Sequence, residues 1–320
     1  MFAARGIAVS LSVFVIVYGI VSLAVCLCWR AGQRHSRPYP VRRIADLLFA
    51  MRMFPLVTAA VITAAFTVPS FLLLEPRAID EPLGYVPLVL GIGGALLGIL
   101  GIANAGIALR SASRQISRWT SAAQPVESCG AVPVIRISPV SAITLPAMTA
   151  AGILRPRVLL SGAAESLLTA NELQTALNHE VAHVRRRDNL KRLLLRLVAF
   201  PGMKNLEGAW LEATEMAADD AAVSNACEAL DLAEALIKLS RLTPPEPSAV
   251  LTAALIHSPA SVMNARIERL IAWSDERLVS LPRFSPRYGL GAALATVVLF
   301  AMTYSQLLAG VHTATEWLVR

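Results

Sequence analysis

The stretch HEVAH, residues 179–183, is an HExxH motif within a segment whose pattern predicts a long helix beginning near Asn171. Residues four apart lie on the same face of a helix, so both imidazoles can reach one metal ion. His179 and His183 are therefore predicted zinc ligands, with one Zn²⁺ per chain. Glu180 lies beside them on the helix and can accept a proton from water as the catalytic base.

Two further patterns support this interpretation. Thr169 and Glu172 have the spacing of a capping box, which places the motif in a helix. A second helix, expected over about 208–227, carries a Glu-x-x-x-Asp pattern from Glu215 to Asp219. Glu215 can supply the third ligand that a catalytic zinc site needs, and Asp219, one turn later, can orient a ligating histidine. Glu212 is the alternative third ligand, one turn earlier.

Strand-like and helix-like segments follow one another in the region that contains the motif. A strand is expected over 132–137, which alternates and is rich in β-branched residues, and two more are expected over 142–145 and 157–160. The first is either an internal strand or a sheet edge that an extended substrate could join. Further helices are expected over about 230–239 and 260–273, and the proline-rich stretch between them is expected to be a linker. Strands followed by helices predict an α+β domain.

Composition places this domain beside a membrane. Of the 320 residues, 55% are hydrophobic and only 16% are charged, which is too apolar for an ordinary soluble enzyme. A bilayer span needs about 20 apolar residues. Four stretches meet that length and predict four transmembrane helices: 6–28, 54–74, 86–109 and 288–308.

The distribution of arginine predicts the orientation of these spans, because basic loops remain in the cytoplasm. The segment between the first two spans and the start of the segment after the third are basic, whereas the loop between the second and third is acidic. The N-terminus is therefore expected outside the inner (cytoplasmic) membrane. The predicted organisation is three spans with a basic cytoplasmic loop in 1–109, a cytoplasmic domain in 110–287, and a fourth span with a short external tail in 288–320.

The HExxH motif is followed by a basic run from Arg185 to Arg196, interrupted by leucines. Such charge is too costly inside hydrocarbon, so the metal site is expected at or beyond the cytoplasmic interface. The run is either a face in contact with anionic headgroups of the bilayer or a solvated helical face. Direct nucleic-acid binding is not expected, because no aromatic stacking residues are interleaved with the run.

Glycines recur along the third predicted span. Gly94 and Gly98 form a GxxxG pair, which allows close approach of two helices. The pair predicts either packing within the chain's own helix bundle or dimerisation.

At these residues the sequence resembles the BlaR/MecR-type membrane metallopeptidases, the antirepressor peptidases. The resemblance rests on GILRPRVLL at 152–160, HEVAHVRRRD at 179–188, and Glu215 through Asp219. It implies a zincin-like (gluzincin) metalloprotease domain in a multi-span α-helical membrane protein. It also implies that His179, His183 and Glu215 hold the zinc and that Asp188 is a structural partner close to the site.

Members of this family cleave a cytoplasmic transcriptional repressor, or themselves, in signal transduction. The same protein substrates are therefore expected here. The family's best-known sensors carry a penicillin-binding domain after the fourth span, but no S-x-x-K motif follows residue 308 in this sequence. β-Lactam sensing is consequently not expected, and the signal is expected to enter through a partner membrane sensor protein or through the spans themselves.

Two other functions remain open at the level of sequence. An HtpX-like quality-control protease also combines HExxH with Glu-x-x-x-Asp beside membrane spans. A catalytically inert signalling scaffold would retain the fold without turnover. His257, outside the metal motif, is expected in a loop or cap, with hydrogen bonding to a transition state as the alternative.

Overall fold

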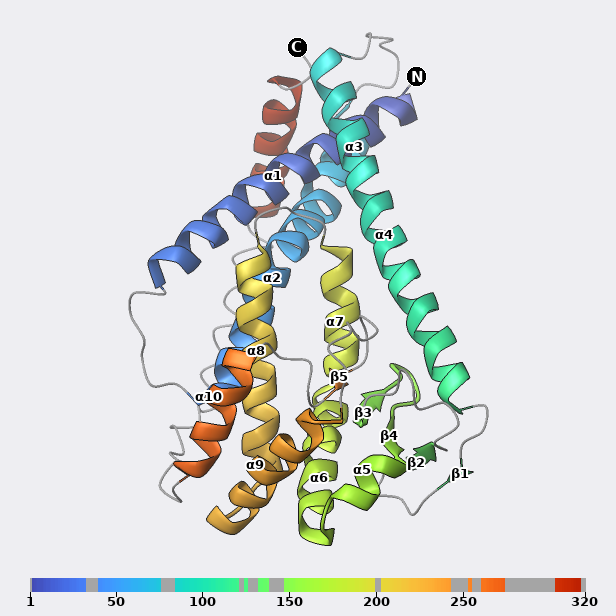
Figure 1. Ribbon diagram of the computed structural model, residues 1–320. Coiled ribbons are helices and arrows are strands. Elements are labelled where there is room, and N and C mark those ends of the chain that lie inside the picture. Colours follow the sequence, from blue (N-terminus) through green and yellow to red (C-terminus); the bar gives the residue numbers. More distant parts are fainter. Residues whose placement is uncertain are drawn as a thin grey trace.

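The computed structural model places two groups of elements at opposite ends of an elongated molecule (Figure 1). The apolar helices gather at one end, and a small sheet with shorter helices lies at the other. The structure describes residues 2–32, 40–75, 84–120, 124–125, 132–137, 147–198, 203–242, 253–254, 260–273 and 303–317.

Three helical segments are long and apolar enough to cross a membrane: Phe2–Ala31, Val41–Leu74 and Tyr85–Thr120. They correspond to α1 (Phe2–Gly32), to α2 (Val41–Ile62) continued by the π-helix η1 (Thr63–Thr67) and α3 (Val68–Leu74), and to α4 (Tyr85–Thr120). The first three predicted spans are confirmed as candidate spans. Most of the predicted fourth span lies outside the described residues, and its last residues belong to a helix over 303–317.

The helices extend well beyond the predicted spans. The basic segment before the second span is partly helical, because α2 already begins at Val41. Arg52 of this helix is only 4% exposed, and its Nη2 donates a hydrogen bond to the carbonyl oxygen of Val198 at 2.8 Å. Val198 follows the last turn of α7, where a cation is favourable. At the other boundary, α4 runs on past Arg110 to Thr120.

Glycines of α4 allow close contacts with α1. A Cβ at Gly91 would lie 3.1 Å from the Cα of Ala8, and one at Gly94 would lie 2.9 Å from Cγ2 of Val15, both in α1. A Cβ at Gly98 would meet nothing within 4 Å in the part of the chain that the structure describes. Of the predicted GxxxG pair, Gly94 therefore packs against α1, and Gly98 does not face another described helix.

The sheet has five short strands: β1 (Gln124–Pro125), β2 (Val134–Ile137), β3 (Met148–Ala151), β4 (Arg157–Ser161) and β5 (Ala253–Ala254). Their order is β1-β2-β4-β3-β5, with β2 and β4 parallel and the other pairs antiparallel. The strand predicted over 132–137 is thus internal, between β1 and β4. The one predicted over 142–145 lies outside the described residues, and β3 was not predicted.

Six further helices complete the domain among the described residues: α5 (Gly162–Leu167), α6 (Ala170–Arg186), α7 (Asp188–Leu197), α8 (Lys204–Ala222), α9 (Ala226–Ser240) and α10 (Ala260–Ile271). The capping box at the start of α6 is confirmed, because Thr169 and Glu172 each bond the other's backbone N–H. The helix predicted over 208–227 ends earlier, at Ala222. The short helices α5 and α7 were not predicted.

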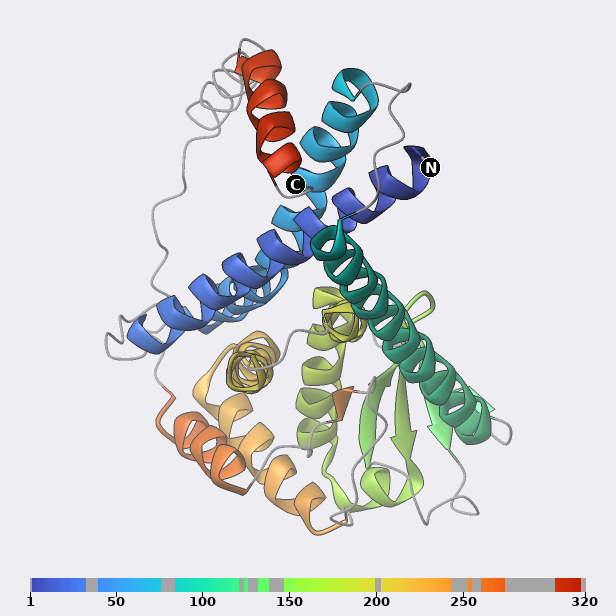
Figure 2. The same ribbon diagram turned by 90° about the horizontal axis from the view of Figure 1, so that it is seen from above.

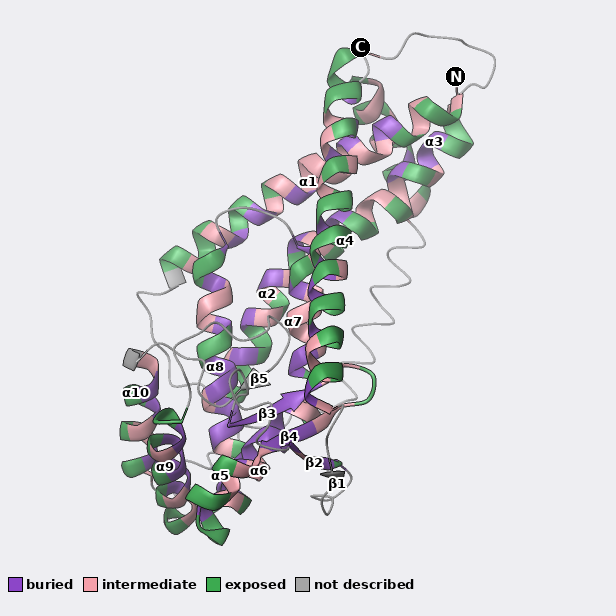
Figure 3. Cartoon of the chain, turned by 45° about the vertical axis from the view of Figure 1, so that its right-hand side comes forward, coloured by how far each residue is buried: buried purple, intermediate pink, exposed green. Residues whose placement is uncertain are grey.

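Both faces of the sheet are covered (Figure 2). Along β4, Val158 and Leu160 join the core formed with α6, α9 and α10, whereas Leu159 packs with Trp119 near the end of α4. Figure 3 shows the resulting contrast between buried strands and the exposed outer sides of α1 and α4. The apolar helix α4 thus continues into the core of the domain and connects the group of apolar helices to the sheet.

Replacement of Gly94 by leucine tests this packing. Its side chain would overlap Val15 and the carbonyl oxygen of Leu11, which would lie 3.0 Å from the new Cβ. Gly94→Leu should lower the free energy of unfolding by about 1–3 kcal/mol, measured as a lower thermal midpoint of the detergent-solubilised protein. Gly98→Leu is the matched control and should leave the midpoint almost unchanged. Equal destabilisation by both replacements would contradict the helix packing.

Candidate metal centre

Two helices bring three donor side chains together at the centre of the domain. His179 and His183 come from α6 and Glu215 comes from α8, and their donor atoms all lie within 4.8 Å of one another. All three are buried, with exposures of 0%, 2% and 5%. The structure therefore brings together the three side chains that the sequence analysis selected.

The geometry of this group fits one tetrahedral metal ion. The two Nε2 atoms of His179 and His183 lie 3.1 Å apart. Two nitrogens at the usual zinc distance, in tetrahedral arrangement, are separated by about 3.3 Å. The carboxylate oxygens of Glu215 lie 3.6 Å from Nε2 of His179 and 3.7 Å from Nε2 of His183. Oε2 of Glu215 is buried and has no hydrogen-bond partner among the described residues, so its lone pairs are available to a cation.

The opposite nitrogen of each imidazole faces a carboxylate. Nδ1 of His179 lies 2.9 Å from Oδ1 of Asp219, and Nδ1 of His183 donates a hydrogen bond to Oδ2 of Asp188 at 2.8 Å. Asp188 can return toward His183 because Arg187 takes a left-handed conformation, with φ 54° and ψ 40°, between α6 and α7. Such carboxylates fix the tautomer and the ring orientation of a ligating histidine.

Arg266 of α10 is a central residue that the sequence analysis missed. It is fully buried and grips Asp219 with two hydrogen bonds, from Nε at 2.8 Å and from Nη2 at 2.7 Å. Its Nη1 lies 3.3 Å from Oε2 of Glu215. The guanidinium therefore balances two buried carboxylates at once. Only the tertiary structure brings α10 to this site, so no local sequence pattern indicated the contact.

Glu180 faces the same cluster but is held by the sheet. The backbone N–H of Ala150 in β3 donates a hydrogen bond to its Oε2 at 2.5 Å. Oε1 is buried without a hydrogen-bond partner among the described residues. Asn189 fixes the same strand by donating to the carbonyl oxygens of Ala150 and Gly152, at 3.0 Å and 3.3 Å. Glu180 therefore has one anchored oxygen and one oxygen open to a proton.

Burial and neighbouring charges shift the pKa values in this cluster. Burial raises the pKa of Glu180 above its usual range. For His183, burial lowers the pKa, but the carboxylates of Glu215 and Asp188 outweigh it and raise the pKa to about 10. For Asp219, burial raises the pKa, but the charge and hydrogen bonds of Arg266 lower it to about 2. The buried carboxylates around the imidazoles thus give this cluster a negative potential, which attracts a proton or a metal cation, and a metal ion that binds to the imidazoles must displace their protons.

The remaining candidates lie elsewhere. Glu212, the alternative third ligand, is exposed on α8 and does not belong to the donor group. Asp220 forms an ion pair with Arg269 at 2.7 Å, away from the imidazoles. His257 lies outside the described residues.

The arrangement and its apolar helices are those of a membrane-associated metallopeptidase. The family described as BlaR1 peptidase M56 matches residues 78–270, more than half of the chain, so the chain belongs to this family. The resemblance noted in the sequence is therefore confirmed, and membership implies a metal cofactor, typically zinc. Among curated proteins, none matches the chain closely enough to serve as a relative.

Loss of the Arg266 charge should damage the centre more than loss of a nearby surface charge. Arg266→Gln leaves two buried carboxylates without their cation and should lower the free energy of unfolding by about 3–5 kcal/mol. Arg269→Gln removes the partly exposed pair with Asp220 and a long hydrogen bond, 3.4 Å, to the carbonyl oxygen of Met216, and should cost about 0–1 kcal/mol. Thermal unfolding of the metal-free protein measures both. Similar small losses for both variants would contradict the role of Arg266.

Proposed function

We propose that this protein is a membrane-anchored, zinc-dependent endopeptidase that cleaves a cytoplasmic protein in signal transduction. The proposed substrate is a transcriptional repressor, the chain itself, or both. The observation that carries the proposal is the buried donor group of His179, His183 and Glu215 beside Glu180. Membership of the peptidase family supports the reaction class.

In this proposal His179, His183 and Glu215 hold one zinc ion, and Asp219 and Asp188 orient the two imidazoles. The short distance between the two Nε2 atoms and the contacts of both Nδ1 atoms with carboxylates support these roles. Three protein ligands leave a fourth position for water or substrate, as in catalytic zinc sites.

Zinc in such a site supplies Lewis-acid polarisation of the scissile carbonyl and makes water more acidic. Glu180 moves the proton. Its Oε2 stays on the N–H of Ala150, while Oε1 accepts the proton from the attacking water and passes it to the leaving amide nitrogen. The fixed strand β3 thereby sets the direction in which Glu180 presents its free oxygen.

Substitution at the centre separates metal binding from turnover. His179→Ala, His183→Ala and Glu215→Ala each remove a ligand and should lose most of the bound zinc, measured by elemental analysis of the purified protein. Glu180→Gln should retain zinc at one ion per chain. It should nevertheless lose casein cleavage by at least about 100-fold, the scale of a general-base contribution.

Glu212→Ala is the matched control, because Glu212 lies on the same helix as Glu215 but is exposed. It should retain both zinc and turnover. Zinc loss in Glu212→Ala but not in Glu215→Ala would move the third ligand by one helical turn. Zinc loss in Glu180→Gln as complete as in His179→Ala would overturn the assignment of the base.

The proposed place of this chemistry is the cytoplasmic side of the inner membrane, with the N-terminus outside. The arginines between the first two spans and after the third support this orientation. The bilayer is thus one partner and the cytoplasmic substrate another. We further propose that a separate membrane sensor protein delivers the signal, and that repacking of α4 against its neighbours transmits it to the domain.

Quantitative proteomics of cells with wild-type protein or Glu180→Gln tests the signalling function. A small set of cytoplasmic cleavage products, including a DNA-binding repressor or this chain, should occur only with the wild type. Cleavage of many damaged membrane proteins would instead favour an HtpX-like quality-control protease. The absence of any difference would favour an inert scaffold, and products confined to the outside would contradict the orientation.

A further inference from the structure

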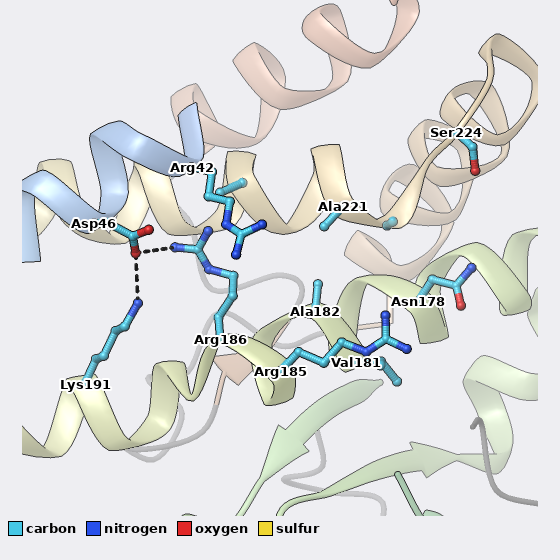
Figure 4. A pocket seen from close by; sticks show the side chains of 12 residues that line it. Arg42, Asp46, Asn178, Val181, Ala182, Arg185, Arg186, Lys191, Ala221 and Ser224 are labelled. Carbon is cyan, nitrogen blue, oxygen red and sulfur yellow. Dashed lines mark hydrogen bonds and ion pairs between the residues drawn. The ribbon is translucent and has the colours of Figure 1, made fainter. Parts of the chain in front are cut away.

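A cavity lies on the other side of α6 from the metal centre. It has a volume of about 580 Å³, within the range of small-molecule sites. Its walls come from α2, α6, α7 and α8, and Figure 4 shows the side chains that line it. From α6 it takes positions 178, 181, 182, 185 and 186, whereas the metal centre takes 179, 180 and 183. The two sites therefore use different faces of one helix.

The lining is strongly cationic. Four basic side chains, Arg42, Arg185, Arg186 and Lys191, face a single acid, Asp46. Nζ of Lys191 lies 3.1 Å from Oδ1 of Asp46, and Nη2 of Arg186 lies 3.8 Å from the same oxygen (Figure 4). Asp46 is 55% exposed, so water screens its charge. Asp188, buried behind the lining, lies 3.5 Å from Nε of Arg186 and 3.9 Å from Nζ of Lys191. Two carboxylates thus face four basic side chains, and the cavity keeps a net positive charge.

Arg186 carries the strongest indication of a ligand. Its side chain is only 9% exposed, yet none of its three guanidinium nitrogens has a hydrogen-bond partner among the described residues. The nearest carboxylate oxygens, of Asp46 and Asp188, lie at 3.8 Å and 3.5 Å, beyond good hydrogen-bond length. A planar guanidinium matches the oxygens of a phosphate with paired hydrogen bonds. A buried arginine in this state is thus suited to an anion entering the cavity.

We propose that this cavity binds a phosphate-bearing anionic group. In this site Arg186 and Lys191 contact the phosphate oxygens, and the exposed Arg42 and Arg185 attract the anion from the rim. The phosphate displaces Asp46 as their counter-ion. Neither the metal centre nor its turnover is needed for this binding.

The position of the cavity points to the bilayer as one source of that group. The end of α7 reaches the apolar part of α4, because the carbonyl oxygen of Leu197 would lie 2.5 Å from a Cβ at Gly101. Lys191 lies about 9 Å before Leu197 along the axis of α7. Arg110, where α4 becomes basic, lies about 14 Å beyond Gly101 along the axis of α4. The cavity and the start of the basic part of α4 thus lie at similar depth, where lipid headgroups are found.

A single residue, Asp188, connects the cavity to the metal centre. Nε of Arg186 lies 3.5 Å from Oδ2 of Asp188, the same oxygen that accepts the hydrogen bond from His183. Asp46 belongs to α2 and its two partners belong to α6 and α7. A phosphate that takes over Arg186 and Lys191 therefore loosens the ionic link between the second span and the helices of the metal centre.

Binding of defined lipids to the full-length detergent-solubilised protein tests the proposal. Native mass spectrometry would compare phosphatidylglycerol, phosphatidylcholine and inorganic phosphate as probes. Wild-type protein should retain phosphatidylglycerol over phosphatidylcholine. Arg186→Gln should weaken this binding by about tenfold, the scale of one charge-assisted hydrogen bond. Asp46→Asn should tighten it several-fold, because the internal counter-ion is removed.

Arg196→Gln is the matched control, since Arg196 is an exposed arginine of α7 outside the cavity. It should change binding by less than about twofold, as expected for a screened surface charge. If inorganic phosphate binds with the same dependence on Arg186 and Asp46 while the lipids are not distinguished, the proposal holds with a soluble phosphate compound as ligand. The proposal would be overturned if neither phosphatidylglycerol nor inorganic phosphate bound, or if Arg186→Gln and Arg196→Gln weakened binding equally. If Arg186→Gln does not fold, failure of Asp46→Asn to tighten binding overturns it equally.

Discussion

The convergence of His179, His183 and Glu215 in the interior constrains the rest of the domain. Three buried donors within 4.8 Å, none more than 5% exposed, need partners for every polar atom that does not face the shared centre. Asp219 and Asp188 supply them for the imidazoles. Asp219 needs a cation in turn, and Arg266 of α10 provides it while it also faces Glu215. Arg186 and Lys191 are the cations nearest to Asp188. The cluster therefore depends on helices far apart in the sequence.

The same requirement links the metal centre to the apolar helices. α8 bears Glu215 on one face and packs its other face against α2 through Trp210 and Leu206, in a core cluster that Val25 of α1 also joins. α7 begins with Asp188 and ends beside Gly101 of α4. Movement of these helices relative to one another therefore changes the support of the donor group directly. A signal that repacks the apolar helices has a short physical route to the catalytic residues.

Local patterns in the sequence predicted what depends on helical spacing. In HExxH, in the capping box and in the pattern from Glu215 to Asp219, the key residues are three or four positions apart. The structure places these patterns on α6 and α8 as expected. Contacts made by folding could not be predicted in this way. Arg266 and the N–H of Ala150 reach the centre only through tertiary packing. The GxxxG pattern likewise could not tell that, among the described residues, Gly94 meets another helix and Gly98 does not.

The central claim is that one zinc ion is held by two imidazoles and a carboxylate, with Glu180 outside the ligand set. X-ray absorption at the zinc edge tests it most directly, on wild-type protein and on Glu180→Gln. The account predicts two imidazole nitrogens at about 2.0–2.1 Å, oxygen in the remaining positions, no sulfur, and the same spectrum in both proteins. A single imidazole, a sulfur ligand at about 2.3 Å, or a changed ligand set in Glu180→Gln would contradict it.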